Sequence, residues 1–154
     1  MTKLEQQLKF EEGLRLEKYK CTAGRWTIGY GHNLEAHPNW PNGEKIGDTI
    51  TEEEAEHLLA LDISNVIISL WGRWPEIINL DKARRDACIN MAFQLGINGF
   101  LRFRKMKKAL MNKDWDLAHK EALDSNWEKQ TPARALRVAL QLLTGQYYAI
   151  PSNS

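Results

Sequence analysis

Hydrophobic residues recur with a helical period at the start of the chain. Leu4 and Leu8 lie one helical turn apart. Thr2 precedes them, with Glu5 three positions later, which is the capping-box pattern of a helix N-terminus. Gly13 can adopt the left-handed conformation that ends many helices. The pattern therefore predicts a short N-terminal helix that stops at this glycine.

The period changes to two in the next segment. Trp26, Ile28 and Tyr30 alternate with threonine and glycine, which favours a half-buried strand. Ala23-Gly24 supplies a turn ahead of that strand. We therefore expect a small twisted hairpin or a three-stranded sheet.

A long helix is predicted after a surface loop at residues 35–48, which is rich in proline, asparagine and glycine. Thr51 and Glu54 form a second capping box at its start. The helical spacing of apolar residues continues toward Pro75, which marks the limit. Such a helix is long enough to connect two lobes.

The rest of the sequence has a helical pattern. Asp81 can cap a segment that is apolar almost all round, so this segment should be the central buried helix until Gly96 breaks it. Shorter helices are predicted over residues 103–112, 115–123 and 132–143. The fold class is therefore α+β and predominantly helical.

This order of elements predicts a two-lobed organisation. We expect a small β-containing lobe at residues 13–50, a connecting helix at 51–72, and a larger helical lobe at 73–154. The helical lobe would also collect the N-terminal helix, residues 1–12. A chain of 154 residues is long enough for one solid core and short for two independent ones.

Composition narrows the class of protein. With 43% hydrophobic and 27% charged residues, the chain is an ordinary globular sequence, which disfavours disorder and coiled coil. Its formal net charge of +1 attracts neither nucleic acid nor membrane. The start lacks the apolar stretch of a secretory signal, and no run reaches the length of a bilayer span. We expect no nucleic-acid partner, no stable membrane insertion and a monomer.

Metal and cofactor sites find no support in the sequence. The four histidines show no paired spacing, and Cys21 and Cys88 lie far apart, which also suggests a reducing compartment. Gly29 and Gly31 begin a dinucleotide fingerprint, but Leu34 occupies the third glycine position. No metal and no cofactor are therefore expected.

Three residues near the N-terminus could carry chemistry. Glu12 would lie at the carboxyl end of the first helix, where the helix dipole disfavours a negative charge, so this side chain could donate a proton. Cys21 offers a thiol that becomes a nucleophile or a base when it ionises. Thr27 offers a hydroxyl that could hold a water. Taken singly, each is better explained as a solvated glutamate, a buried spectator thiol or a strand-forming threonine.

The string EEGLRLEKYKCTAGRWTIGYGHN resembles the N-terminal motif of the bacteriophage-type lysozymes. That family pattern is Glu, eight residues, Asp or Cys, five residues, and Thr, which falls here on Glu12, Cys21 and Thr27. The segments RRDACINMAFQLG and SNWEKQTPARALRV, and a closing T-G-x-Y, extend the resemblance over nearly the whole chain.

The resemblance implies a muramidase that cuts the β-1,4 bond between N-acetylmuramic acid and N-acetylglucosamine in peptidoglycan. Glu12 would be the general acid. Family members with Asp at the second position use it, with Thr, to steer a water. Cys21 could do the same as a thiolate and keep an inverting outcome, or it could attack the anomeric carbon and give a retaining one. The retained Thr27 favours the first mechanism.

Supporting residues also carry over from the family. Arg134 matches an arginine that pairs with the catalytic glutamate, and its charge would oppose the helix-end effect. His32 matches a histidine that pairs with an acid on the connecting helix, here Asp62. Substrate contacts are expected from three further positions, while two others are altered. The first three are Phe93, Gln94 and Asn33, and the altered two are Met106 and Glu121.

The resemblance further implies an endolysin for host lysis, which accumulates in the host cytoplasm and reaches peptidoglycan with the help of a holin. The alternative is a catalytically impaired wall-binding protein of the same fold, supported by cysteine at the second position. A basic cluster from Arg102 to Lys108 is a solvated helix face, or it attracts the anionic cell wall or phosphate groups of an outer membrane in a salt-dependent way. A small nucleic-acid-binding protein that uses this cluster explains neither the motif spacing nor the neutral charge.

Overall fold

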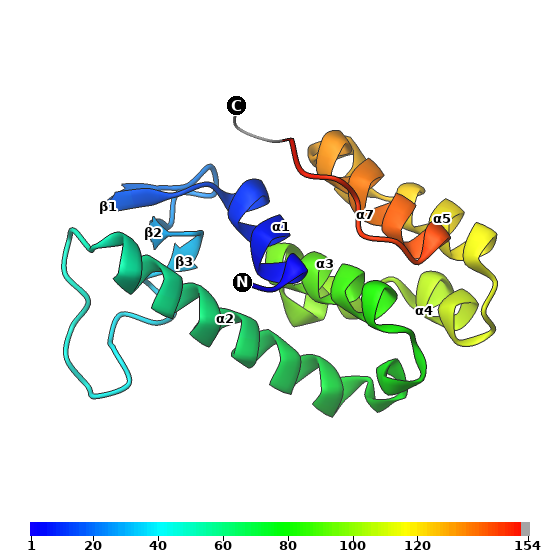
Figure 1. Ribbon diagram of the computed structural model, residues 1–154, viewed down its shortest axis with the longest axis horizontal. Helices are drawn as coiled ribbons and strands as arrows, with labels where there is room; N and C mark the ends of the chain where they lie inside the picture. Colours follow the sequence, from blue (N-terminus) through cyan, green and yellow to red (C-terminus); the bar gives the residue numbers. More distant parts are fainter. Residues whose placement is uncertain (152–154) are drawn as a thin grey trace. The chain divides into compact units, whose positions relative to one another are not determined.

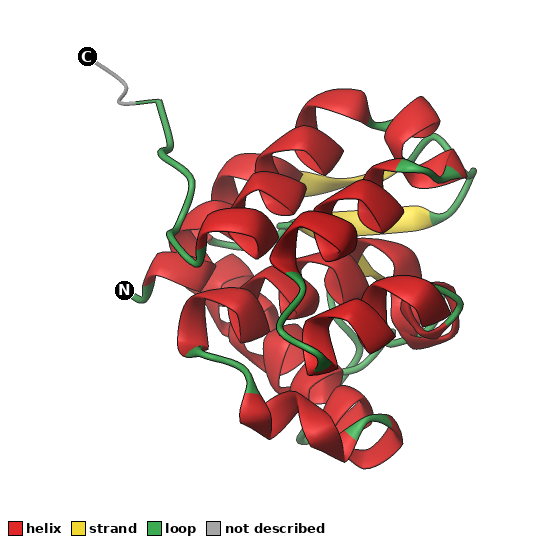
Figure 2. Ribbon diagram, turned by 90° about the vertical axis from the view of Figure 1, so that its right-hand side faces the viewer, coloured by secondary structure: helices red, strands yellow, loops and turns green. Residues whose placement is uncertain are grey.

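The computed structural model describes residues 1–151, and the chain forms two compact units, Met1–Ser64 and Asn65–Ser154. Figure 1 labels the elements in chain order, and Figure 2 shows how few strands accompany the helices. The predicted α+β, predominantly helical class is confirmed. The boundary between the units falls inside a long helix, α2 (Glu52–Arg73). The grouping of residues 1–12 with the helical lobe stays a prediction.

Unit 1 begins with helix α1 (Lys3–Glu12), as its capping pattern predicted. The Thr2 hydroxyl accepts a hydrogen bond from the Glu5 backbone N–H at 3.1 Å. The following strands form an antiparallel sheet in the order β1-β2-β3. Their bounds are Arg15–Lys20 for β1, Trp26–Gly29 for β2 and His32–Asn33 for β3.

The predicted alternation of burial along the central strand β2 is wrong. Trp26 is 39% exposed, whereas the next residues, from Thr27 to Tyr30, are all buried. The reason is that β2 is covered on both faces. At Gly29 a Cβ would already lie 3.4 Å from the Cβ of Ala55 on α2. The strand also ends at Gly29, whose φ of +68° turns the chain toward β3.

Helix α2 begins where the second capping box predicted. The Glu54 backbone N–H donates to the Thr51 hydroxyl at 3.1 Å, and the Thr51 N–H donates to the Glu54 carboxylate at 2.9 Å. The helix ends at Arg73, two residues before Pro75, which opens the short 3₁₀ helix η1 (Pro75–Asn79). The 3₁₀ helix η1 was not predicted.

Unit 2 is helical beyond α2. Helix α3 (Lys82–Leu101) is capped by the Asp81 side chain and interrupted at Gly96, where φ is +77°. Both features were predicted. The remaining helices are α4 (Arg104–Met111), α5 (Trp115–Leu123), α6 (Asn126–Gln130) and α7 (Pro132–Thr144). The five-residue helix α6 was not predicted.

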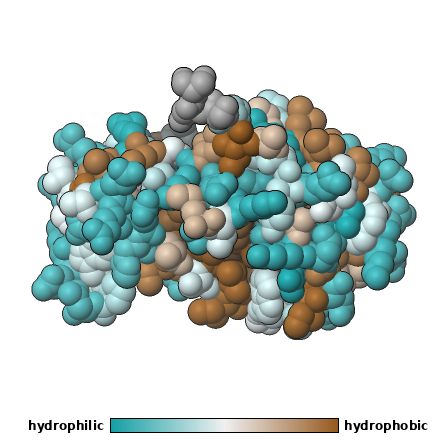
Figure 3. Space-filling view, in the orientation of Figure 1, coloured by the Kyte–Doolittle hydropathy of each residue, from teal (hydrophilic) through white to brown (hydrophobic). Residues whose placement is uncertain are grey.

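Helix α3 buries polar side chains as well as the apolar ones that were expected. Arg84 donates through Nε to the Leu142 carbonyl at 2.7 Å, near the end of α7. Asn90 donates to the Tyr148 hydroxyl at 3.1 Å. These bonds satisfy buried polar groups and fix the segment after α7 to α3. On the face drawn in Figure 3 the surface is mainly hydrophilic, with apolar side chains scattered across it.

Candidate active site

Glu12 is the last residue of α1, and the chain turns sharply after it at Gly13, where φ is +71°. Its side chain is half-buried and lies against the backbone of Gly31. A Cβ at position 31 would stand 2.5 Å from Glu12 Oε1, closer than real Cβ contacts. The lack of a side chain at Gly31 therefore makes room for the carboxyl group.

Cys21 lies at the tight turn that joins β1 to β2. Its backbone N–H donates to the Arg25 carbonyl at 2.9 Å, and its carbonyl accepts from the Gly24 N–H at 2.8 Å. Backbone N–H groups of Arg25 and Ala23 hydrogen-bond the thiol, and they lower the pKa of Cys21 below its ordinary value despite partial desolvation. The turn thus stabilises a thiolate, which is the reactive form of cysteine.

Thr27 is buried in β2, with its hydroxyl next to Cys21. The hydroxyl donates to the Arg25 carbonyl at 2.9 Å. When Cys21 is ionised, the same single proton can turn to its sulfur instead, and this hydrogen bond contributes to the lowered pKa of that thiol. A hydroxyl has one proton and two lone pairs, so while it donates to one acceptor it can still accept from a water.

The sequence reasoning missed Tyr19, which lies opposite Thr27 in the register of β1 and β2. The Arg15 guanidinium stands 4.4 Å from its ring centroid. Burial raises the pKa of Tyr19, and the negative charges of Glu12 and Cys21 raise it further. Tyr19 is therefore within electrostatic reach of both groups. Its place two residues before Cys21 was the sequence signal that could have found it, because residues two positions apart share a face of an extended chain.

His32 and Asp62 lie in contact and join β3 to α2 within unit 1. His32 Nδ1 is 2.8 Å from the nearer Asp62 carboxylate oxygen, and Nε2 is 2.8 Å from the His37 carbonyl. Burial favours the neutral ring, but the hydrogen bond and charge of Asp62 and the His37 carbonyl outweigh it and raise the pKa of His32. Because both ring nitrogens face acceptors, the imidazolium form satisfies this site fully.

The expected substrate contacts are engaged in hydrogen bonds or half-buried. Asn33 Oδ1 accepts from the backbone N–H groups of Glu35 and Ala36, at 3.0 and 3.1 Å, so this oxygen closes a turn. In unit 2, the Gln94 amide accepts from Trp127 Nε1 at 2.9 Å and donates to the Thr131 hydroxyl at 3.0 Å. The neighbouring Phe93 is half-buried on α3. A direct role in substrate contact stays a prediction for all three.

Arg134 is buried in unit 2 at the start of α7. Its Nε and Nη2 groups donate to Asn90 Oδ1 at 3.1 and 2.9 Å. Asn90 in turn reaches Tyr148, so α3, α7 and the segment after α7 share one polar network. The network fixes the guanidinium in a defined position. Its pairing with Glu12 stays a prediction.

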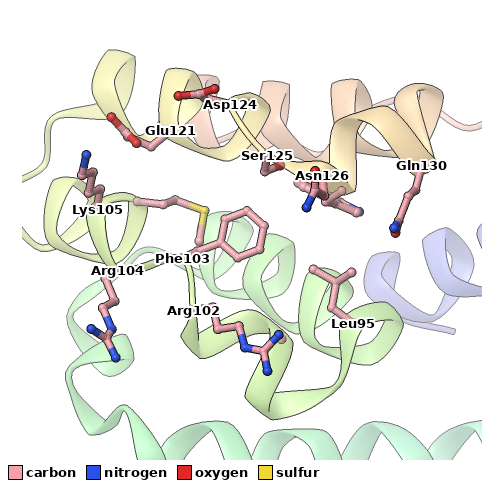
Figure 4. A pocket seen from close by; sticks show the side chains of 13 residues that line it. Leu95, Arg102, Phe103, Arg104, Lys105, Glu121, Asp124, Ser125, Asn126 and Gln130 are labelled. Carbon is pink, nitrogen blue, oxygen red and sulfur yellow. The ribbon is translucent and has the colours of Figure 1, made fainter.

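Unit 2 holds an open pocket of about 620 Å³ (Figure 4). Basic side chains from the end of α3 and from α4 line one side, and Glu121 and Asp124 of the α5 segment lie opposite. Trp127 contributes an aromatic wall and is also hydrogen-bonded to Gln94. Both altered family positions, Met106 and Glu121, line this pocket.

Residues 1–151 contain no group of three or more His, Cys, Asp or Glu side chains that could hold a metal ion. Among the helices in this described part of the chain, none combines the length and hydropathy that crossing a membrane requires. Cys88 is fully buried, and desolvation raises the pKa of its thiol well above the ordinary range. Cys21 is therefore the thiol available for chemistry.

A family model described as Phage lysozyme matches residues 9–141. The chain is 35% identical over 164 residues to probable T4-type lysozyme 1 of Dictyostelium discoideum, covering 94% of this chain and 96% of that protein. An endolysin of Acyrthosiphon pisum secondary endosymbiont phage 1 is 38% identical over 101 residues, or 66% of this chain and 62% of the endolysin. The pre-baseplate central spike protein of Enterobacteria phage T4 is 36% identical over 155 residues, or 90% of this chain and 27% of the spike protein. The chain therefore belongs to the phage lysozyme family and is a glycoside hydrolase of the lysozyme type.

Proposed function

We propose that the protein hydrolyses the β-1,4 bond between N-acetylmuramic acid and N-acetylglucosamine in bacterial peptidoglycan. The names of its relatives, a T4-type lysozyme and an endolysin, support this reaction. One observation carries the proposal. Within unit 1, the Cys21 thiol, whose pKa is lowered by backbone N–H groups, is a hydrogen-bond partner of the Thr27 hydroxyl, and Tyr19 lies within electrostatic reach of both Cys21 and Glu12. Glycoside hydrolysis with inversion requires a general acid and a general base, and a hydroxyl beside the base can help to hold the attacking water.

In the proposed reaction, Glu12 acts as the general acid. Its carboxylic proton passes to the glycosidic oxygen while the bond from that oxygen to the anomeric carbon breaks and the sugar becomes oxocarbenium-like. The carboxylate then regains a proton from solvent. Contact with the backbone of Gly31 holds the carboxyl group in place during this transfer.

The second half of the reaction uses Cys21 and Thr27. A water on the far face of the sugar forms the new bond to the anomeric carbon, and its proton passes to the Cys21 sulfur, so the product is inverted. The Thr27 hydroxyl hydrogen-bonds this water. The alternative is direct attack of the sulfur on the anomeric carbon, which gives a thioglycoside and a retained product after hydrolysis. The hydrogen bond between Thr27 and Cys21 supports the first route, because it places a water-binding group beside the base.

The test is the anomeric configuration of the first product, read by NMR during turnover on purified peptidoglycan. We expect inversion, an inactive Glu12→Gln variant and a Cys21→Asp variant that keeps much of the activity. Cys21→Ala should lose activity severely. A retained product together with a trapped thioglycoside would replace water activation by covalent attack. Absence of cleavage, with wall binding intact, would favour the catalytically impaired wall-binding protein.

We also propose that the protein acts as an endolysin in host lysis. It would accumulate in the host cytoplasm as a monomer and depend on a holin to reach peptidoglycan. The endolysin among its relatives supports this role, while the spike protein that shares this region supports a role in the virion. Expression with and without a holin separates the two. An endolysin lyses cells only with the holin, and a virion protein is instead found in purified particles.

A further inference from the structure

Helix α4 and the turn before it carry a dense cluster of basic side chains. Four of them are exposed: Arg102, Arg104, Lys105 and Lys108, here called the α4 basic face. The fifth, Lys107, is half-buried, with its ammonium group 5.9 Å from the centroid of the Trp74 ring. Since the chain as a whole has a net charge of only +1, this density of charge is a local property of α4.

The charges of the α4 basic face are not neutralised by close partners. Within residues 1–151, no member of this face forms an ion pair within 4.0 Å. The positive charge of this face also acts on Lys107. Burial lowers the pKa of that lysine, and the charge of Arg104 lowers it further. Acidic side chains of Glu121 and Asp124 lie across the pocket in Figure 4, and the charge of Glu76 acts on Lys107.

The α4 basic face offers charge without an apolar anchor. Ala109 and Leu110 of this helix are buried, and Met106 is also buried, although it lines the same pocket as three of the basic side chains. The exposed large hydrophobic side chains of the described chain all lie outside α4. A helix that inserts into a bilayer needs an exposed apolar face, so an anchored membrane contact is disfavoured. Arginine and lysine side chains instead suit a polymer that carries carboxylates or phosphates.

We propose that the α4 basic face is an electrostatic docking surface for the peptidoglycan network, whose peptide stems carry free carboxylates. This inference rests on the proposed function, which supplies peptidoglycan as the substrate. A patch of one sign raises the local concentration of an oppositely charged partner and speeds its association. The face therefore holds the enzyme near its polymer between cuts.

Binding is measured by co-sedimentation with purified peptidoglycan freed of attached phosphate polymers, in the Glu12→Gln background so that the polymer stays intact. One variant replaces Arg102, Arg104, Lys105 and Lys108 with glutamine. Its matched control replaces four exposed lysines elsewhere and changes the net charge equally: Lys45, Lys113, Lys120 and Lys129. We expect the basic-face variant to bind about tenfold more weakly at about 0.02 M salt, and the control to stay within about threefold of the parent. The difference should vanish near about 0.5 M salt.

Further experiments identify the binding partner of this face. Amidation of the peptidoglycan carboxylates should weaken the parent to the level of the basic-face variant. Equal losses in the basic-face and control variants would overturn the proposal, since net charge alone would then explain binding. It is also overturned if the difference requires phosphate-bearing walls, or if duplex DNA binds this face more tightly than peptidoglycan. If every protein, including the unmodified chain, neither binds nor cleaves peptidoglycan, the proposed function falls as well. If the quadruple variant does not fold, the pair Arg104→Gln and Lys108→Gln repeats the test with an expected loss of about threefold.

Discussion

The contact between Gly31 and Glu12 allows a sharp test of how the proposed acid is held. In Gly31→Ala, the new Cβ would lie 2.5 Å from Glu12 Oε1 and 3.1 Å from its Cδ. Ordinary contact begins at 3.4 Å, so the carboxyl group must move by about 0.9 Å. A misplacement of about 1 Å in a reacting group can reduce the rate about 100-fold. We therefore expect kcat to fall about 100-fold, with a smaller change in KM.

The same substitution also strains the backbone. Gly31 has a φ of +73°, a conformation that costs an alanine about 1–2 kcal/mol. For a chain of this size, such a loss lowers the thermal midpoint by roughly 2–8 °C. Stability and activity must therefore be measured together, by thermal unfolding and by the rate of wall clearing well below the midpoint.

Gly43→Ala is the matched control. Gly43 also has a positive φ, of +92°, but a Cβ there meets nothing within 4 Å. This variant should lose comparable stability and keep its turnover, because the new methyl group has no neighbour within 4 Å to displace. If Gly31→Ala loses no more activity than Gly43→Ala does, the packing of Glu12 against position 31 is not what positions the acid, and the reasoning is refuted.

Four further predictions concern titrating groups and the core. The pKa of His32 is raised in the folded protein, so its pair with Asp62 stabilises the fold fully below about pH 6.5. This stabilisation decreases as the pH rises through the folded pKa of His32. Asp62→Asn should therefore lower the free energy of unfolding in urea by about 3 kcal/mol at low pH, and by distinctly less at pH 9. Because the pKa of Cys21 is lowered, iodoacetamide should modify this thiol faster than free cysteine at pH 7, and the modification should block activity. Cys88 should react only after unfolding. Modification of both thiols in the native protein would contradict this prediction. In Cys21→Asp, the acid limb of the rate profile should move to lower pH, and an unmoved limb would remove Cys21 from the role of base. Phe100→Ala, at a ring that is 0% exposed, should cost about 3–5 kcal/mol in the same unfolding assay.

The elements that were predicted correctly are those fixed by local chemistry. Thr2, Thr51 and Asp81 each accept a hydrogen bond from a backbone N–H three residues later, and that interaction needs no tertiary partner. A left-handed glycine interrupts α3 at Gly96 for the same reason. Such signals can be found from residues three or four positions apart.

Features that depend on tertiary packing were missed. Arg84 carries a charge, yet its side chain is buried. Carbonyl groups near the end of α7 accept hydrogen bonds from its guanidinium group. The Trp115 ring packs against the same group, with its centroid 3.7 Å from Arg84 Cζ. No residue within a few positions of Arg84 in the sequence predicts these partners. The short helix α6 is a similar case, since its Ser125 makes no side-chain cap and its Trp127 is held by Gln94 of α3.

In the proposed site, too, some features could be predicted from the sequence and others depend on tertiary packing. The motif spacing singled out Glu12, Cys21 and Thr27, but only through resemblance to a family, because each residue alone has a commoner explanation. What the motif did not give is how these groups are tuned. Backbone N–H groups of the turn after Cys21 stabilise its thiolate, and Tyr19 lies within electrostatic reach of Glu12 and Cys21. Both depend on the exact path of the hairpin.

The failed prediction on β2 and the position of the proposed acid have one physical cause. Alternating burial requires a strand with one face in solvent, but at Gly29 and Gly31 the chain adopts positive φ and presents bare backbone to its neighbours. Ala55 of α2 packs on the first glycine, and the Glu12 carboxyl packs on the second. A side chain at either position would restore a more ordinary strand pattern and push away the group that needs the space. The glycines that made the period misleading are therefore the residues that let a glutamate from α1 reach the sheet.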